Sequence, residues 1–135
     1  MHVLRQVHRA LAPTGLVLNI HPLGDDFPVL AGERGIGFVD TRKFRLILEA
    51  MDEGVEQTLA EGLFREIRAL RRHVVERYDD AAEALEEADS WESLRLPSPV
   101  RRRLRKNDAT PIEFIDTVRY RLLGKLEPRT IDDRL

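Results

Sequence analysis

Residues 8–22 read HRALAPTGLVLNIHP, and this stretch decides which fold the chain is expected to adopt. It begins with the end of an amphipathic helix, in which apolar side chains recur at helical spacing over residues 3–11. Pro13 cannot continue the helical hydrogen-bond ladder and Gly15 accepts a positive φ, so these two residues end the helix. The apolar run Leu16–Ile20 that follows has the length of one strand and is typical of a strand covered on both faces.

The composition is that of a folded protein with one small domain. The chain has 135 residues, of which 42% are hydrophobic, and a formal net charge of -2. This charge gives no general attraction to nucleic acid or to an anionic membrane. No apolar run is long enough to span a bilayer, and the start MHVLRQVHRA is interrupted by His and Arg, so no secretory signal is expected. The chain has no cysteine and therefore no disulfide. We predict a cytoplasmic protein with no nucleic-acid and no membrane partner.

Downstream of the first strand the pattern predicts a hairpin and a long helix. Two short β segments are expected over residues 28–31 and 35–39, separated by a glycine-containing turn. Asp40 or Thr41 then caps a helix that Gly62 ends. The expected buried stripe of this helix consists of Phe44, Ile47, Leu48, Met51, Val55 and Leu59.

The segment Leu63–Tyr78 is ambiguous. Its apolar residues keep helical spacing, whereas the β-branched and aromatic residues of HVVERYD favour a strand. Periodicity alone favours a helix. Beyond this segment, Asp80 and Glu83 form a capping-box-like start for a helix through Ala88, and a basic helix is expected over residues 98–106.

The last predicted element is a strand over Ile112–Leu126. The apolar residues Ile112, Phe114, Val118, Tyr120 and Leu122 stand at even positions, opposite the charged residues Glu113, Arg119 and Arg121, which is the alternation of a half-buried strand. Arg121 is one of the odd residues and is therefore expected on the polar face. The chain after Pro128 is polar.

Arg9, Leu11, Pro13 and Gly15 carry a resemblance to a known family. Together with the apolar strand after them, they resemble the helix–turn–strand segment of class I S-adenosylmethionine-dependent methyltransferases. That segment commonly reads Arg, a hydrophobic residue, Leu, any residue, Pro, Gly, Gly and then a strand, and Thr14 stands here in place of the first glycine of the pair. The downstream segments GLF and RYDDAAEALEEA are similar to those of bacterial methyltransferase-like proteins.

The resemblance covers residues 1–127 and implies the C-terminal half of the family's domain. The expected fold is α/β, or an α+β remnant: a partial Rossmann-like methyltransferase domain with a mixed sheet, antiparallel C-terminal strands and flanking helices. The family has a strand where this chain has HVVERYD, so we assign Leu63–Tyr78 to a strand against its periodicity. Strand Leu16–Ile20 is expected to pair with the antiparallel strand Ile112–Leu126. Residues 128–135 are expected to form a loose tail.

The family binds S-adenosylmethionine through a Gly-rich turn after its first strand and an acidic residue that ends its second strand. Neither feature occurs in this sequence. The one glycine cluster, GERGIG at residues 32–37, follows the strand that matches the family's fifth and opens no helix, so it is interpreted as a hairpin turn. We therefore expect no cofactor-binding and no catalytic residue in this chain. S-adenosylmethionine is expected to bind only when an amino-terminal half completes the domain.

Two residues after the first strand are candidates for substrate contact, because α/β folds place ligands at the carboxyl ends of strands. These candidates are His21 and Asp25. The alternatives are a loop histidine bonded to nearby backbone and, for Asp25 with Asp26, a pair of solvated acids. The other histidines lack acidic neighbours at metal-ligand spacing, so no metal site is predicted. The basic run VRRRLRKN, residues 100–107, lacks interleaved aromatics and is interpreted as a solvated helix face.

The function that the resemblance implies is that of the substrate-side half of an S-adenosylmethionine-dependent methyltransferase, which is not expected to be catalytic alone. Two alternatives stay open: a non-catalytic homodimeric binding or regulatory module, and the second half of a split enzyme. In each case the apolar edge of strand Leu16–Ile20 predicts a partner, either a second copy of the chain or the missing amino-terminal half.

Overall fold

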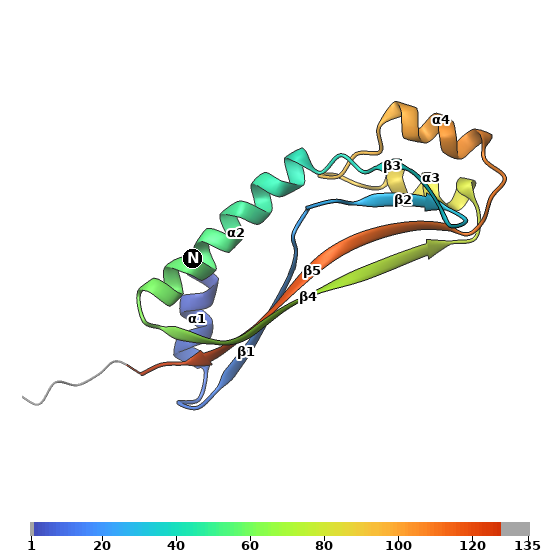
Figure 1. Cartoon of the computed structure of the whole chain (residues 1–135). Helices are drawn as coiled ribbons and strands as arrows, with labels where there is room; N and C mark the ends of the chain where they lie inside the picture. The colour runs from blue at the N-terminus through green and yellow to red at the C-terminus, as the bar shows by residue number, and fades with distance from the viewer. Residues whose placement is uncertain (1, 128–135) are drawn as a thin grey trace, which may run out of the picture. The chain divides into compact units, whose positions relative to one another are not determined.

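A computed structural model describes residues 2–127 (Figure 1), and the predicted tail 128–135 lies outside them. The chain is mixed α+β, and in this part it has four helices and five strands. In chain order the elements are α1 (His2–Ala10), β1 (Leu16–Pro22), β2 (Pro28–Ala31), β3 (Arg34–Phe38), α2 (Arg42–Ala60), β4 (Phe64–Tyr78), α3 (Ala81–Asp89), α4 (Ser98–Lys106) and β5 (Ile112–Lys125).

Strand β5 is central in a five-stranded antiparallel sheet, in which it pairs with β1, β2 and β4 (Figure 1). The Lys125 N–H donates to the Gly15 carbonyl at 3.0 Å, and the Leu23 N–H donates to the Thr117 carbonyl at 2.9 Å. These bonds set β1 antiparallel to β5, so the predicted pairing of the first strand with the last is confirmed. The sheet is antiparallel rather than mixed, because within residues 2–127 β1 has no parallel neighbour.

The segment Leu63–Tyr78 contains strand β4. The strand that the resemblance implied is therefore confirmed, and the helix that the periodicity favoured is not formed. An ion pair of 3.0 Å between Arg77 and Glu113 joins β4 to β5. Phe64 is the one buried side chain of β4, and the others are exposed or half-buried. The apolar spacing of this segment therefore does not mark a buried helical face.

The β2–β3 hairpin occupies the glycine cluster. Ala31 pairs with Arg34 across the turn, and Gly32 in the turn has a positive φ of 62°. Strand β2 also pairs with β5, where Val29 lies opposite Phe114. The cluster therefore forms a hairpin turn, as predicted, and leads into a strand.

Helices α2 and α3 begin at capping residues that the sequence indicated. The Asp80 carboxylate accepts from the Glu83 N–H at 2.9 Å, and the Asp40 carboxylate accepts from the Arg42 N–H at 3.1 Å. The predicted buried stripe of α2 is too wide, because Ile47 and Met51 are 45% and 39% exposed. No element described here covers these two side chains.

The described residues form two compact units, each with its own core. The first unit contains residues 2–20, 49–70 and 120–127, and the second contains residues 21–48 and 71–119. The buried core of the first unit consists of Leu4, Val55, Phe64 and Leu123. The larger core of the second unit consists of Phe27, Val29, Ala31, Ile36, Val39, Ala84, Ala88, Leu96, Val100, Leu104, Ile112 and Phe114.

Strand β1 is covered on one face only, which corrects the expectation that both faces are covered. Val17 packs against the core of the first unit. The alternate residues Leu16, Leu18 and Ile20 are 56%, 56% and 52% exposed. Because strand side chains alternate between faces, these three side chains share the face opposite Val17.

Ile67 of β4 lies on the same uncovered face of the first unit. Its Cδ1 atom is 3.0 Å from the position that a Cβ would take on Gly124. Gly124 follows Leu123, whose side chain lies in the core, so Ile67 lies on the face away from that core. We call this surface the open apolar face; its residues are Leu16, Leu18, Ile20 and Ile67.

The buried side chains of β5 change parity along the strand. In the second unit they are even-numbered, as at Phe114 and Val118, which is the alternation that the sequence predicted. In the first unit they are odd-numbered, at Arg121 and Leu123. The expectation that Arg121 lies on a polar face is therefore wrong, because each half of β5 packs into the core of its own unit.

Candidate functional site

The carboxyl end of β1 leads into a hollow of about 370 Å³ in the second unit. The loop after β1 contributes acidic side chains, β4 contributes a guanidinium and an imidazole, and β5 contributes one apolar and one hydroxyl side chain. A hollow of this size accommodates a small organic molecule. Its lining residues are Asp25, Asp26, Pro28, Arg71, His73, Ile115 and Thr117.

The loop that carries Asp25 is held by two hydrogen bonds and one close contact. The Leu23 N–H donates to the Thr117 carbonyl at 2.9 Å, and the Thr41 hydroxyl donates to the Gly24 carbonyl at 2.7 Å. Gly24 has a φ of 68°, and a Cβ there would lie 2.8 Å from a side-chain atom of α2. Only glycine adopts this conformation at so close an approach without strain, so the turn places Asp25 with little freedom.

The hollow presents charges of both signs that are not paired with one another. Within residues 2–127 the side chains of Asp25, Asp26 and Arg71 make no ion pair or hydrogen bond. The Nδ1 atom of His73 lies 3.4 Å from the Thr117 hydroxyl. This arrangement suits a ligand with both cationic and anionic groups, and the imidazole beside it can donate or accept a hydrogen bond.

Of the two predicted substrate residues, Asp25 lines the hollow and His21 does not. Asp25 is exposed at the tip of the loop. His21 is 3% exposed and lies within β1, one residue before its end. A role in substrate contact stays a prediction for both residues.

Sequence reasoning missed Arg71, His73 and Thr117 as lining residues of this hollow. Strand alternation does put Arg71 and His73 on one face once β4 is assigned as a strand. Their meeting with Thr117 depends on the register between β4 and β5, which are far apart in the chain. The local sequence carries no signal for that register.

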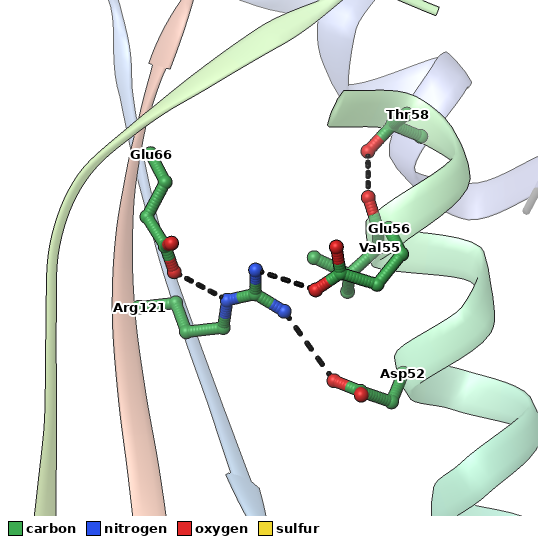
Figure 2. A network of polar contacts seen from close by, with 6 residues as sticks. All are labelled: Asp52, Val55, Glu56, Thr58, Glu66 and Arg121. Atoms are coloured by element: carbon green, nitrogen blue, oxygen red, sulfur yellow. Dashed lines mark hydrogen bonds and ion pairs between the residues drawn. The ribbon is translucent and has the colours of Figure 1, made fainter. Parts of the chain in front are cut away.

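A second polar cluster lies in the first unit, around Arg121 of β5 (Figure 2). The Arg121 side chain is 4% exposed, and each of its nitrogen atoms faces a carboxylate. Nε lies 2.6 Å from Glu66, Nη2 lies 2.8 Å from Glu56 and Nη1 lies 3.3 Å from Asp52. Figure 2 shows the guanidinium between β4, which carries Glu66, and α2, which carries the other two acids.

The charges of this cluster are paired with one another, which favours a structural role. Burial lowers the pKa of Arg121, but the hydrogen bonds with Glu66 and Glu56 more than reverse this effect and leave the pKa raised. The nearby Thr58 hydroxyl is also engaged, since it donates to the Val55 carbonyl at 2.8 Å. With a carboxylate at each of its nitrogens and a side chain that is 4% exposed, Arg121 joins α2 to the sheet rather than facing a ligand in solvent.

Asp116 is a half-buried carboxyl group in the part of β5 that lines the hollow. It stands between Ile115 and Thr117, which line the hollow, so its side chain points to the opposite face of β5. Its Oδ1 atom is buried and has no hydrogen-bond partner among the described residues. Burial raises the pKa of Asp116, and the charge of Glu76 adds to this effect.

Comparison of the chain with models of protein families, with curated proteins and with solved structures finds no match. None of the helices within residues 2–127 combines the length and apolar character needed to cross a membrane. In the same residues no three His, Cys, Asp or Glu side chains gather as metal ligands would. Function therefore has to be inferred from the geometry of the chain itself.

Proposed function

We propose that this chain is the substrate-side half of a methyltransferase-like domain of the S-adenosylmethionine-dependent class. In that family the strand resembling Leu16–Ile20 is the fifth of seven, and the last two long strands finish the sheet as an antiparallel pair. Strands β4 and β5 form an antiparallel pair of this kind, and β5 lies beside β1. This strand arrangement is the observation that carries the proposal.

The open apolar face supports the idea of a half-domain. Doubly wound α/β domains have helices on both faces of the sheet. In the first unit α1 and α2 contribute to the core on one face, while four large apolar side chains stay exposed on the other. We propose that the amino-terminal half of the domain covers this face.

The chain does not fit the family's cofactor by itself. Its glycine cluster forms the β2–β3 hairpin rather than a turn that opens a helix. The proposed contribution of this chain is therefore to bind the methyl acceptor in the hollow at the end of β1. There Asp25 and Arg71 orient groups of opposite charge, and His73 holds or releases a proton of the acceptor.

The proposal is tested by calorimetric titration of S-adenosylmethionine into two samples. The chain alone is expected to give no binding up to about 1 mM, because unpaired polar groups of the cofactor are costly. The second sample is the chain co-expressed with the product of the coding sequence immediately upstream, if that sequence encodes a strand, a Gly-rich turn and a following acid. This complex is expected to bind in the micromolar range.

Matched variants identify the surface that joins the halves. Leu18→Asp on the open apolar face is expected to prevent formation of the complex. Ile47→Asp, which changes an apolar residue of α2 that is 45% exposed against 56% for Leu18, is expected to leave it intact. Micromolar binding by the chain alone, or an upstream sequence without such a segment, would reject the proposed half-domain.

A homodimeric binding module is the second candidate, and the open apolar face is also the observation that favours it. A second copy of the chain would bury the same four side chains. Light scattering at low micromolar concentration distinguishes the candidates. A stable dimer that Leu18→Asp dissociates, together with no upstream half, indicates the module. A monomer that stays soluble without a partner contradicts both candidates.

A further inference from the structure

We infer that the hollow between the β2–β3 hairpin and α4 binds the phosphate group of a small phosphorylated molecule. This hollow measures about 540 Å³ and belongs to the second unit. Cationic side chains from two elements that are distant in the sequence line it. Its lining residues are Arg34, Gly35, Ile36, Gly37, Arg103, Lys106 and Asn107.

The close packing of the hairpin against α4 builds the hollow. Gly37 of β3 has a φ of 148°, and a Cβ there would lie 2.5 Å from the Val100 side chain. The absence of a side chain lets β3 and α4 meet at this point. Arg103 Nη1 then donates to the Ile36 carbonyl at 2.8 Å, which fixes the direction of its guanidinium. The basic end of α4 is thereby held beside the bare backbone of the hairpin.

The hollow offers hydrogen-bond donors and positive charge. Three cations line it and no carboxylate does. Arg34 and Lys106 have no ion-pair partner within the part of the chain described. The Asn107 side-chain oxygen accepts from the Ala109 N–H at 2.8 Å, so its amide N–H groups are the part that a ligand can use. Three like charges that share one hollow repel one another, and an anion with several acceptor oxygens relieves this repulsion.

Compensation of the helix dipole does not account for the whole arrangement. Basic residues in the last turn of a helix offset its negative end, which is a sufficient reason for Arg103, Arg105 and Lys106. It is no reason for Arg34, which comes from the hairpin about seventy positions earlier in the chain. Convergence from two elements is what a built anion site requires.

The lining also indicates which phosphorylated molecule fits. The volume lies within the range of pockets that hold a small organic ligand, so there is space beyond a phosphate ion. Ile36 is the one large apolar residue of the lining, and no aromatic side chain is available to stack on a base. A polar phosphate monoester such as a sugar phosphate fits these features better than a nucleic-acid strand. The inference does not depend on the proposed methyltransferase role.

The test is a two-dimensional amide NMR titration of the full chain with glucose 6-phosphate, inorganic phosphate and glucose. We expect saturable shifts from glucose 6-phosphate at Gly35, Gly37 and the Asn107 side-chain amide, with a Kd of about 0.1–1 mM. Glucose is expected to cause no shift. The variants Arg34→Gln and Lys106→Gln are expected to weaken binding by about tenfold or more, because each loses one charged contact.

Arg102→Gln is the matched control, because Arg102 is exposed on the same helix and does not line the hollow. It is expected to change the affinity by less than about twofold. All three altered side chains are exposed, so thermal melts close to that of the parent are expected and verify the fold. Absence of saturable shifts, or equal weakening by Arg102→Gln, overturns the site. If inorganic phosphate binds with the same affinity as glucose 6-phosphate, the sugar does not contribute to binding and the site is not one for a sugar phosphate.

Discussion

The two units of the molecule bury their side chains in different ways. Within residues 2–127, the second unit closes around twelve buried apolar residues supplied by the hairpin, α3, α4, the first half of β5 and the loops that join them. The buried apolar cluster of the first unit has four residues, and beside it lies a guanidinium surrounded by three carboxylates. The first unit also exposes the open apolar face, which has no counterpart of similar size on a strand of the second unit.

This difference indicates where the molecule needs a partner. Exposed contiguous apolar surface is unusual on a self-sufficient domain and marks an interaction site. The second unit has the large core expected of a part that is stable by itself, and both hollows lie in it. We therefore expect the second unit to bind ligands and the first unit to bind another protein chain through its open apolar face.

The largest expected effect compares two fully buried leucines, one from each unit. Leu104→Ala removes a side chain from the large core and is expected to lower the free energy of unfolding by about 4 kcal/mol, since dense surroundings cannot collapse into the cavity. Leu123→Ala in the small core is expected to lower it by about 2–3 kcal/mol. Urea denaturation measures both. Equal losses in the two variants would contradict the inference that the core of the second unit is more densely packed than that of the first.

The next effect separates the two faces of β1. Val17→Asp places a charge against the small core and is expected to lower the free energy of unfolding by about 2–4 kcal/mol. Leu18→Asp changes a side chain that is 56% exposed, and its effect on unfolding is expected to stay within about 0.5 kcal/mol. Thermal melts of the two variants provide the measurement. If Leu18→Asp destabilises the monomer as strongly as Val17→Asp, β1 is covered on both faces after all.

The third effect concerns the buried guanidinium. Arg121→Leu removes the buried cation that contacts Asp52, Glu56 and Glu66, and a loss of about 2 kcal/mol is expected. The loss is smaller than for a fully buried ion pair because the three acids are partly exposed and reach water. Arg65→Leu on the exposed part of β4 is the control and is expected to have almost no effect. Added salt is expected to reduce the deficit of Arg121→Leu, and a deficit independent of salt would contradict this explanation.

The smallest effect concerns Asp116 in the second unit, a half-buried carboxyl group whose Oδ1 atom has no hydrogen-bond partner among the described residues. Burial raises its pKa, so the folded state holds this proton more tightly than the unfolded state does. The contribution of Asp116 to the free energy of unfolding is therefore most favourable at low pH. It decreases as the pH rises from about 4 through the raised pKa of the folded state. Asp116→Asn is expected to stabilise the protein at pH 7 by at most about 1 kcal/mol and to give no gain near pH 3. A gain that is the same at both pH values would contradict a titration effect.

Much of the fold could be predicted from local sequence signals. Pro13 and Gly15 marked the end of α1, and Asp80 with Glu83 marked the start of α3, because caps and breakers act within a few residues. Strand β4 could not be recognised from periodicity. Only one of its side chains is buried, so its sequence does not need to alternate between apolar and polar residues. The family resemblance supplied that assignment.

The candidate sites were less predictable, because they depend on contacts between distant segments. Asp25 could be found from its place after a strand, but His73 joins Thr117 only through the pairing of β4 with β5. Arg34 and Lys106 each look like ordinary surface cations until the hairpin packs on α4. The burial of Arg121 was missed for a similar reason. The alternation of residues in β5 does not show that its buried side chains change from even-numbered to odd-numbered positions along the strand.

The composition of β4 has a consequence for the protein in concentrated solution. This strand pairs on one edge only within residues 2–127, and five of its fifteen residues are arginines. Positive charge along a free edge discourages the addition of strands from other molecules. High ionic strength screens this charge, with a Debye length of about 3 Å at 1 M salt. We therefore expect the protein to store well at low ionic strength and to form β-rich aggregates in high salt, the reverse of ordinary salting-in.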